Sequence, residues 1–433
     1  TFAISGLSVV GRDFYGVFPL KGKVMNTKNT STKRIADNSE LNNLRTILGL
    51  KYGVDYSDPK NAATLRYGKI IIATDADVDG FHIRGLVLNA LIDQYPTLSA
   101  IPGFFSFFVT PILKATWRGQ KLNFFRVEDF EAWKKDRAGF SVKYYKGLGT
   151  SSAAEAKEYF SQLGSFVKPV SFDENSGTAL EIAFGNDTNA RKAWISNVSR
   201  NDDDDNDVSS FVYGDLRDYS LYNIERSIPD VIDGLKPSQR KVLYTCLRKK
   251  ITREIKVSQL AGIVSEFSSY HHGENSLVDT IIGMAQSHCG SNNLNLLEPV
   301  GQFGSRLMNG NDSASGRYIF TFLSEITRHI FREDDDSILE YRNDDGSDVE
   351  PVVYVPVLPI VLVNGCSGIA TGWSTNVPPH KPDDVRRLCL DILSGNPPTK
   401  LVPHYKGFLG SITPRGDDDG VFVCRGVNTV ARN

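Results

Sequence analysis

The sequence predicts a multidomain protein of the α/β plus α+β class. Its 433 residues correspond to about three domains of ordinary size. Strands and helices alternate up to about residue 170, and two amphipathic helical stretches follow residue 219. Beyond residue 320 the chain is rich in Val, Ile, Pro and Gly, which favours bent strands. We therefore expect an α/β region, a helical region and a β-rich region, in that order.

Composition and targeting features narrow the class of protein. Hydrophobic residues make up 40% of the chain and charged residues 23%, as is typical of globular proteins. No run of about 18 apolar residues occurs, so we expect no membrane partner. The chain starts without an initiator Met or a signal peptide, and we expect this start to lie inside a longer chain. The five cysteines form no C-x-x-C pair, which indicates a reducing compartment.

The N-terminal region contains two recognisable strand–turn–helix units. Lys69–Thr74 is a continuous apolar run, typical of a strand buried on both faces of a parallel sheet. It ends in DADVDG, and the helix-like run IRGLVLNALIDQY follows, which completes half of a β–α unit. The block FSVKYYKGLGTSSAAEAKEYF predicts a strand, a glycine-rich turn and a helix. Ser151 or Ser152 is the expected N-cap of that helix, with Glu155 in its first turn.

Three carboxylates follow the buried strand at every second position. Asp75, Asp77 and Asp79 would share one face of extended backbone, where they would repel one another unless a cation lay between them. Hard oxygen ligands at the carboxyl end of a parallel strand suit Mg²⁺. An EF-hand loop is excluded because Leu86 stands where that loop needs a glutamate. A solvated acidic turn remains the alternative.

The middle of the chain changes character twice. Residues 171–210 are polar and contain NDDDDND at 201–207, which predicts a mobile, extended linker. Further on, SQRKVLYTCLRKK and KVSQLAGIVSEFSS are amphipathic stretches joined by ITREI, an arrangement typical of a helix-turn-helix. Between Lys236 and Lys256 the sequence contains eight Lys or Arg residues and one acidic residue. This run is either a phosphate-binding strip or a solvated helix face.

Seven blocks along the chain resemble, in order, the DNA-cleavage region of eukaryotic-type type IIA DNA topoisomerases. The resemblance covers nearly the whole chain apart from the acidic linker. Both halves of that region share one chain here, as in the eukaryotic and large-DNA-virus branch. The blocks are GRDFYGVFPLKGKVMN, TLRYGKIIIATDADVDGFHIRGL, VKYYKGLGTSSAAEAKEYF, NIERSIPDVIDGLKPSQRKVLYTC, SYHHGENSL, GQFGSRLMNGNDSASGRYIFT and VLVNGCSGIATGWS.

The resemblance implies a fold for each part of the chain. Residues 1–170 look like a Toprim domain, an α/β domain that binds metal, and 171–221 like a linker. Residues 222–328 look like a winged-helix domain that carries the catalytic tyrosine, and 329–433 like the start of a β-rich tower domain. The family's ATPase domain, with its bound ATP, is expected before Thr1. Its coiled coil and exit gate are expected after Asn433.

The implied chemistry is a transesterification. Tyr318 would attack a DNA phosphodiester, form a 5′-phosphotyrosyl link and free a 3′-hydroxyl, so that the break stays reversible. A tyrosine has a pKa of about 10, so it needs help as a nucleophile. The resemblance gives that help to Arg317, and it places His272 beside the scissile phosphate. The alternatives are that Tyr318 belongs to the core and that His272 is a structural hydrogen-bonding residue.

The resemblance also assigns the metal site. Mg²⁺ on Asp75, Asp77 and Asp79 would stabilise the leaving 3′-oxygen. The family completes this site with a glutamate of an E-G-D-S block, which we expect just before Thr1, so the chain as given should cleave poorly. One departure from the pattern is Gly316, where the family commonly has proline before the Arg-Tyr pair. Glycine would loosen the backbone that enters Tyr318.

The remaining blocks imply contacts with DNA. KVSQLAGIVSEF looks like the recognition helix, and Ile369 matches the residue that wedges between base pairs and bends the duplex. For Ile369 the alternative is a packing anchor, and for Lys146 it is a plain tight turn. The predicted DNA-binding residues are Lys21, Lys23, Lys146, Lys236, Arg240, Lys241, Lys256, Gln259 and Ile369. We expect affinity to rest on phosphates and deformability rather than on base reading.

The sequence therefore predicts the cleavage and religation core of an ATP- and Mg²⁺-dependent type IIA topoisomerase. Its partners would be double-stranded DNA and a second copy of the chain, with Tyr318 of one copy working together with the carboxylates of the other. The expected compartment is the nucleus, or the host cytoplasm for a viral enzyme. Two rivals remain: a Toprim-type nuclease or primase, which would not need Tyr318, and a non-catalytic DNA-bending fragment.

Overall fold

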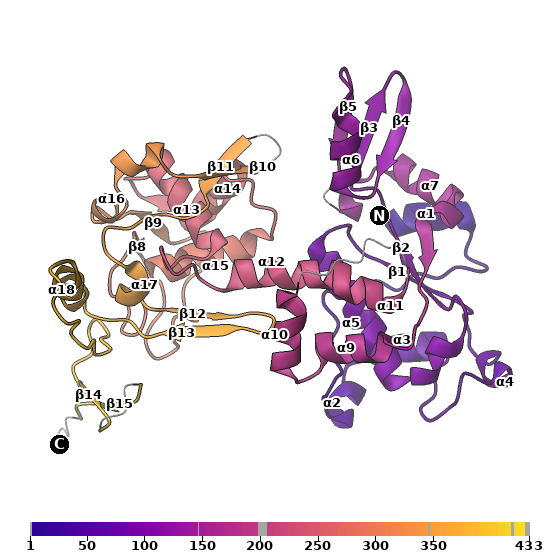
Figure 1. Ribbon diagram of the computed structural model, residues 1–433, viewed down its shortest axis with the longest axis horizontal. Coiled ribbons are helices and arrows are strands. Elements are labelled where there is room, and N and C mark those ends of the chain that lie inside the picture. Colours follow the sequence, from indigo (N-terminus) through magenta and orange to yellow (C-terminus); the bar gives the residue numbers. More distant parts are fainter. Residues whose placement is uncertain (1, 146, 198–205, 345–346, 417–419, 429–433) are drawn as a thin grey trace. The chain divides into compact units, whose positions relative to one another are not determined.

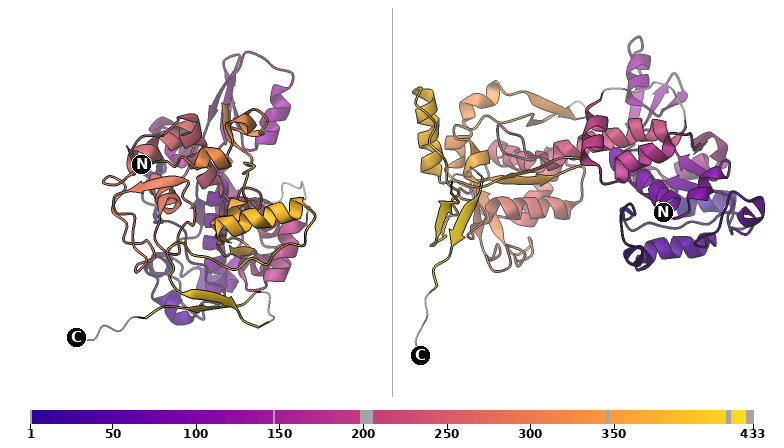
Figure 2. Two further views of the ribbon diagram at one scale, coloured as in Figure 1. Left: turned by 90° about the vertical axis from the view of Figure 1, so that its left-hand side faces the viewer. Right: turned by 60° about the horizontal axis from the view of Figure 1, so that its bottom comes forward.

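The computed structural model describes residues 2–145, 147–197, 206–344, 347–416 and 420–428 (Figures 1 and 2). The chain divides between Tyr222 and Asn223 into two compact units, which we call the N-terminal and the C-terminal unit. Helix α12 (Arg217–Ser227) runs across this division. Among the described residues, no helix is both long and apolar enough to span a bilayer.

A small mixed sheet forms the centre of the N-terminal unit. Strand β1 (Ile70–Ala73) pairs in parallel with the fully buried β2 (Phe105–Phe108), and β6 (Val167–Pro169) pairs antiparallel with β2. Helix α5 (Val78–Gln94) connects the two parallel strands and buries residues 84–91. The parallel strand predicted at 69–74 and the helix predicted after it are thus confirmed.

A second antiparallel sheet supports the glycine-rich turn. Its order is β4-β3-β5, with β3 (Leu113–Trp117), β4 (Gln120–Phe124) and β5 (Ser141–Tyr144) beside α6 (Val127–Lys134), as Figure 1 shows. After β5 come the turn η2 (Leu148–Thr150) and α7 (Ala153–Ser161), as predicted. The other helices of residues 2–170 are α1 (Phe2–Val10), α2 (Thr32–Ala36), α3 (Ser39–Leu48), α4 (Pro59–Ala62), η1 (Pro96–Ala100) and α8 (Leu163–Phe166).

The predicted linker at 171–221 contains packed helices in its described part. They are α9 (Ser176–Phe184), α10 (Thr188–Ser196), α11 (Val208–Phe211) and the π-helical turn η3 (Val212–Leu216). Leu180 and Trp194 are buried, and the ring of Phe211 lies 5.0 Å from that of Phe107 on β2. The structure differs from the prediction because a few apolar residues at helical spacing suffice to dock short helices in a polar sequence. The acidic run at 202–205 lies outside the described residues.

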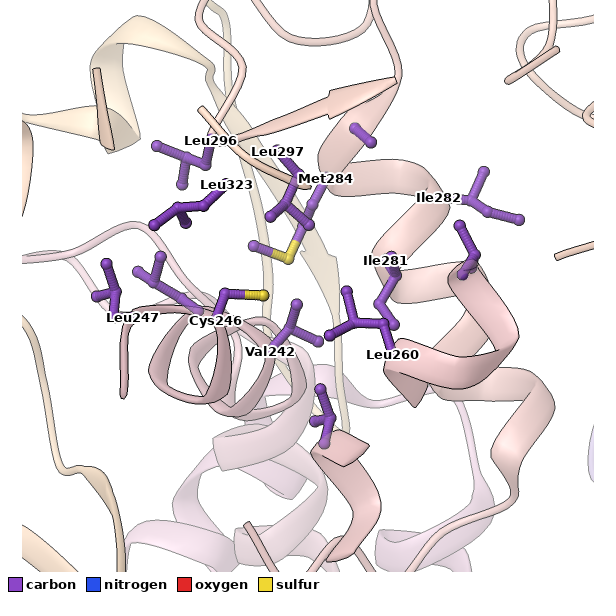
Figure 3. Close-up of a cluster of buried hydrophobic side chains, with 14 of the residues drawn as sticks. Val242, Cys246, Leu247, Leu260, Ile281, Ile282, Met284, Leu296, Leu297 and Leu323 are labelled. Atoms are coloured by element: carbon purple, nitrogen blue, oxygen red, sulfur yellow. The ribbon is translucent and has the colours of Figure 1, made fainter. Parts of the chain in front are cut away.

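Three helices and a three-stranded sheet build the core of the C-terminal unit. The helices are α13 (Pro237–Arg248), α14 (Val257–Phe267) and α15 (Glu274–Ala285). The sheet has the order β7-β9-β8, from β7 (Ile255–Lys256), β9 (Phe320–Leu323) and β8 (Leu297–Val300). Figure 3 shows side chains of all three helices meeting those of β8 and β9. The two stretches predicted as the helices of a helix-turn-helix are helical, as α13 and α14, and β7 lies in the connection between them.

The last hundred residues form two-stranded antiparallel ribbons rather than one sheet. The ribbons are β10–β11 (Tyr341–Asp344, Ser347–Pro351), β12–β13 (Cys366–Ile369, Ser374–Val377) and β14–β15 (Ser411–Pro414, Phe422–Arg425). The helices between them are α16 (Thr327–Ile330), η4 (Glu333–Ser337), α17 (Ile360–Val363) and α18 (Pro382–Leu393). Strands with bends were expected, and α17 shows that one apolar stretch of that region is helical instead.

Candidate active site

Tyr318 lies two residues before β9 and is 71% exposed. Its neighbours Gly316 and Ile319 are buried, so the chain turns the tyrosine outward between two anchored residues. A backbone hydrogen bond from Tyr318 N–H to the Ser315 carbonyl, 2.8 Å long, closes the turn. The alternative that Tyr318 belongs to the core is therefore wrong, and its hydroxyl is accessible.

The N-terminus of α14 fixes the backbone on both sides of the tyrosine. Val257 N–H donates to the Ile319 carbonyl and Ser258 N–H to the Gly316 carbonyl, each at 3.0 Å. These donors belong to the first turn of α14, where backbone N–H groups have no partner within the helix. The predicted recognition helix and the tyrosine turn are therefore one structural piece. The exposed side chains of Lys256 and Gln259 belong to the start of the same helix.

Gly316 is restrained by packing. A Cβ atom at this position would lie 2.9 Å from Cγ1 of Val278 and 3.3 Å from Cγ1 of Val257. The sequence predicts that glycine loosens this backbone relative to proline. In the structure the close approach to α14 and α15, together with the bond from Ser258, restrains it instead.

Arg317 and the two histidines lie in the same unit as Tyr318. The Arg317 guanidinium carbon is 5.6 Å from the centre of the Tyr318 ring, within the range of a cation–π contact. His271 Nε2 is 2.7 Å from Asp344 Oδ2, which ties that ring to β10. His272 is exposed, and its ring meets Tyr270 edge to face at 5.4 Å. His271 thus has a structural bond to β10.

The carboxylate of Asp75 is held by the glycine-rich turn. Leu148 N–H donates to Asp75 Oδ1 at 2.6 Å. Gly147 has a φ of +155°, and a Cβ there would lie 2.8 Å from Asp75 Cγ. The close approach that the glycines were expected to permit is therefore an approach to Asp75. Lys146, the predicted DNA-binding residue of this turn, lies outside the described residues.

Asp77 and Asp79 belong to the start of α5 rather than to an extended strand. Asp77 is the N-cap, and its Oδ1 accepts the Gly80 N–H at 2.7 Å. Asp79 lies in the first helical turn and pairs with Lys23 Nζ at 2.8 Å. The expected common face of extended backbone is therefore wrong. The helix begins at Val78 because an aspartate is a favourable N-cap and acids are favourable in a first helical turn.

The acidic residues fit a metal ion only in a site where another molecule supplies further ligands. In the described part of the chain, no three His, Cys, Asp or Glu side chains are grouped so that they could hold a metal ion. Mg²⁺ commonly takes one or two protein carboxylates and completes its shell with water and phosphate oxygens. The donor chemistry of Asp75 and Asp77 suits that mode of binding, in which a nucleic acid would supply the missing ligands.

Of the two predicted DNA-binding lysines in the PLKGK block, Lys23 contacts one of these acids and Lys21 has a different partner. Besides its pairing with Asp79, Lys23 places its ammonium 5.0 Å from the ring centre of Tyr219. Tyr219 stacks on His82 of α5 at 4.0 Å. The Lys21 backbone N–H donates to Glu40 Oε1 at 2.9 Å, and its side chain is exposed.

The basic run at 236–256 is not one continuous phosphate-binding strip. Arg240 is 3% exposed and pairs with the fully buried Asp233 at 2.7 Å. Lys241 pairs with Glu350 at 2.6 Å and also donates to the Ser268 carbonyl. The prediction that these two cations bind DNA is corrected, because buried acids already neutralise them. Lys236 is half-buried at the N-cap of α13.

Ile369 stands at the end of β12 with 85% of its side chain exposed. The ribbon behind it is anchored: Thr371 N–H and Oγ1 donate to Asn223 Oδ1 at 2.9 and 3.0 Å. A Cβ on Gly368 would lie 2.4 Å from the Ser227 carbonyl oxygen, so the ribbon backbone packs directly on that segment. The alternative of a packing anchor is thus wrong, since a packing anchor would be buried and Ile369 is 85% exposed.

Sequence reasoning missed the groups that hold Asp75. The Leu148 amide is a backbone group, which no residue pattern reveals. Glu155 was predicted only as a first-turn residue, yet its carboxylate bonds Lys143 and Tyr145 across the turn. The one signal in the sequence was the capping pattern Ser152–Glu155 directly after a glycine-rich turn.

Comparison with family models assigns nearly the whole chain. Residues 3–104 match the Toprim domain, and 108–224 match the C-terminal associated domain of TOPRIM. Residues 226–432 match the DNA gyrase/topoisomerase IV family. The second and third matches meet between 224 and 226, close to the division between the two units.

Known proteins match over the same length. DNA topoisomerase 2 of Arabidopsis thaliana is 46% identical over 97% of this chain, and that of Drosophila melanogaster is 44% identical over 95%. The chain spans 29% and 30% of these relatives, less than a third of their length. A crystal structure of the Plasmodium falciparum topoisomerase II DNA-binding, cleavage and re-ligation domain matches with a TM-score of 0.82. It is 43% identical, over 99% of this chain and 60% of that one.

Proposed function

The chain belongs to the type II DNA topoisomerase family and corresponds to its DNA-cleavage region, and from this premise we propose that it cuts and rejoins double-stranded DNA through Tyr318. One observation carries the proposal: the Tyr318 side chain is 71% exposed although the backbone on both sides of it is fixed by α14. A nucleophile needs such presentation, because the reacting atoms must be held near their attack geometry.

The reaction exchanges one phosphate ester for another. The Tyr318 oxygen bonds to phosphorus while the bond from phosphorus to the 3′-oxygen breaks, so the phenol loses its proton and the 3′-hydroxyl gains one. The return attack by that hydroxyl rejoins the strand without further energy input, since the ester is conserved. Arg317, whose guanidinium stays charged, would stabilise the phenolate and the phosphate in transfer. We assign His272 to the same phosphate.

Asp75 and Asp77 would hold a Mg²⁺ ion in this proposal. The ion would supply stabilisation of the charge that develops on the leaving 3′-oxygen. The residues of this chain prepare that site: Leu148 N–H orients Asp75, and Lys23 holds Asp79. For Asp79 to offer Oδ1 to the ion as well, its ion pair with Lys23 must open. Lys23 would then be available for a DNA phosphate.

The DNA path is proposed from four exposed residues and from Lys236, which is half-buried. Lys256 and Gln259 at the start of α14 would contact the duplex beside Tyr318, and Lys21 and Lys236 would add phosphate contacts. Ile369 would insert between base pairs and bend the duplex, trading unstacking for additional contact. Specificity would then follow deformability.

We propose ATP use, duplex passage and dimerisation for the whole protein. The relatives are longer than this chain, which spans 29% of the Arabidopsis thaliana relative. ATP would bind outside this chain. Tyr318 and the acids belong to different units of the chain, which is compatible with a homodimer in which each protomer completes the other's site. Co-expressing Tyr318→Phe with Asp75→Asn/Asp77→Asn, in full-length protein, tests this. Activity of the mixed dimer supports action in trans, and an inactive mixed dimer contradicts it.

The nucleus remains our proposed compartment, with the host cytoplasm for a viral enzyme. Family membership does not decide it, because a mitochondrial DNA topoisomerase 2 of Dictyostelium discoideum is also 44% identical. Localisation of the tagged full-length protein by microscopy tests the proposal.

The proposed cleavage reaction is tested by trapping the covalent adduct between protein and DNA. Full-length protein is incubated with Mg²⁺ and DNA labelled at its 3′ ends, then denatured rapidly. We expect labelled DNA to migrate with the protein, and this adduct to vanish in Tyr318→Phe but persist in Tyr52→Phe, an exposed control tyrosine. Strand cleavage without an adduct, unchanged in Tyr318→Phe, would instead identify a Toprim-type nuclease. Binding and bending without cleavage would identify a DNA-bending protein.

A further inference from the structure

Glu155 of α7 joins the two ends of the glycine-rich turn. Its carboxylate accepts hydrogen bonds from Lys143 Nζ at 2.9 and 3.0 Å and from the Tyr145 hydroxyl, both on the strand side of the turn. It also accepts the Ser152 N–H at 2.8 Å on the helix side. The Ser152 hydroxyl in return accepts the Glu155 N–H at 3.2 Å. One side chain thus joins Lys143 and Tyr145 before the turn to Ser152 after it.

The surroundings of the Glu155 carboxylate favour its charged form. The Glu155 side chain is only 18% exposed. Burial alone would raise the pKa of this carboxyl, but the hydrogen bonds from Tyr145, Lys143 and Ser152 outweigh burial and lower the pKa to about 2. The Lys143 ammonium also lies 4.6 Å from the ring centre of Tyr145, so the three groups form one compact cluster. The cluster therefore persists across the whole range of working pH.

The glycine-rich turn packs closely against Asp75. Leu148 N–H binds Asp75 Oδ1 at 2.6 Å, and the backbone at Gly147 leaves no space for a Cβ beside that carboxylate. Within the turn, Thr150 donates its N–H and its hydroxyl to the Gly147 carbonyl at 3.1 and 2.6 Å. On the strand side, β5 is paired with β3. A shift of either end of the turn would therefore move the amide away from Asp75.

We propose that Glu155 is a positioning residue for Asp75, and that it sets the affinity of the acidic site for divalent metal ions by holding the Leu148 amide on Asp75 Oδ1. With Oδ1 engaged, the carboxylate is oriented to offer its other oxygen. Partners that orient a ligating carboxylate commonly change metal affinity by about 10- to 100-fold when they are removed. This inference deepens the proposed function and rests on it for the role of the metal.

The direct test is Mn²⁺ binding to the full-length protein in complex with a short DNA duplex, which supplies phosphate ligands, monitored by electron paramagnetic resonance. Glu155→Gln keeps the shape of the side chain but removes its charge, so we expect the Kd for Mn²⁺ to rise about 10-fold. Glu158→Gln is the matched control on the same helix, since Glu158 pairs with Lys114 at 3.7 Å instead. Its Kd should stay within about twofold of wild type. Equal Kd values for both variants and wild type would overturn the proposal.

A second variant and a second measurement separate positioning from folding. Tyr145→Phe removes one donor to Glu155 but keeps the Ser152 cap. It should therefore raise the Kd for Mn²⁺ by less than Glu155→Gln does, and it tests the proposal even if Glu155→Gln folds poorly.

In the trapping assay, Glu155→Gln should raise the Mg²⁺ concentration that gives half-maximal adduct and retain the maximum amount of adduct. A lower maximum at an unchanged midpoint would indicate a purely structural role and contradict the proposal. No adduct in wild type, with the Mn²⁺ differences intact, would reject the proposed function alone.

Discussion

Tyr318 and Asp75 are both held by backbone hydrogen bonds, but these bonds act on different parts of the two residues. At Tyr318, amides of α14 bind the carbonyls on either side of it, and the side chain itself extends into solvent. At Asp75, the Leu148 amide binds the carboxylate itself. Asp77 and Asp79 are engaged through their carboxylates as well, by Gly80 N–H and by Lys23.

The bonds around Tyr318 leave its side chain exposed, whereas the bonds at the acids occupy the carboxylates themselves. The backbone around the proposed nucleophile, Tyr318, is fixed without using the hydroxyl oxygen, so replacing that oxygen should leave the fold intact. The acids contribute their reactive atoms to the fold, so a metal ion or a phosphate must share or replace internal partners. We therefore expect changes at Tyr318 to affect chemistry alone, and changes around the acids to affect stability and metal response together.

The largest expected effect is at Tyr318. Tyr318→Phe removes the attacking oxygen, so the covalent adduct should fall by at least about 10³-fold in the trapping assay. The free energy of unfolding should change by less than about 0.5 kcal/mol in urea denaturation, because the side chain is exposed. Substantial destabilisation by this variant would show that the hydroxyl also supports the fold, and would break the comparison.

Two cations of the basic run should behave in opposite ways. Arg240→Ala leaves the buried Asp233 unpaired and should destabilise the C-terminal unit by about 3–5 kcal/mol in denaturant unfolding. Lys256→Ala should leave stability unchanged, weaken DNA binding for all sequences and reduce the slope of log K against log salt by about 1. A stable Arg240→Ala protein with reduced DNA affinity would restore the prediction that Arg240 binds DNA.

The cluster around Glu155 predicts a pH dependence of stability. Its folded pKa of about 2 lies below the ordinary value, so its charge stabilises the fold above about pH 4.5, and this stabilisation is lost as the pH falls towards 2. The difference in unfolding free energy between wild type and Glu155→Gln should be about 2–3 kcal/mol at pH 7. Chemical denaturation from pH 7 to pH 2 should show it shrinking. A constant difference would mean that packing dominates.

The smallest expected effect is at Ile369. Ile369→Ala should reduce DNA bending, measured by energy transfer between dyes at the two duplex ends, and weaken binding by a few-fold. Unfolding should be unaffected, because the side chain is 85% exposed on a ribbon held by Asn223. Undiminished bending in this variant would assign the bend to other contacts.

Local features were predictable from the sequence, and long-range pairings were not. The strand at 70–73 was predicted at 69–74, and the cap at Ser152 was predicted as Ser151 or Ser152, because both features depend on neighbouring residues only. The pairing of Lys241 with Glu350 joins positions 109 residues apart, and Leu148 reaches Asp75 across 73 residues. No local pattern encodes such partners, so the basic run was interpreted as free cations and Glu155 as a helix cap alone.

The central claim, that Tyr318 is the nucleophile, is tested most directly by mapping the trapped adduct. Full-length protein is trapped on DNA, digested with nuclease and protease, and analysed by mass spectrometry. The account predicts one nucleotide-bearing peptide, containing residues 317–320, with a 5′-phosphate on the Tyr318 oxygen. A nucleotide on any other residue, or cleaved DNA with no modified peptide, would contradict it.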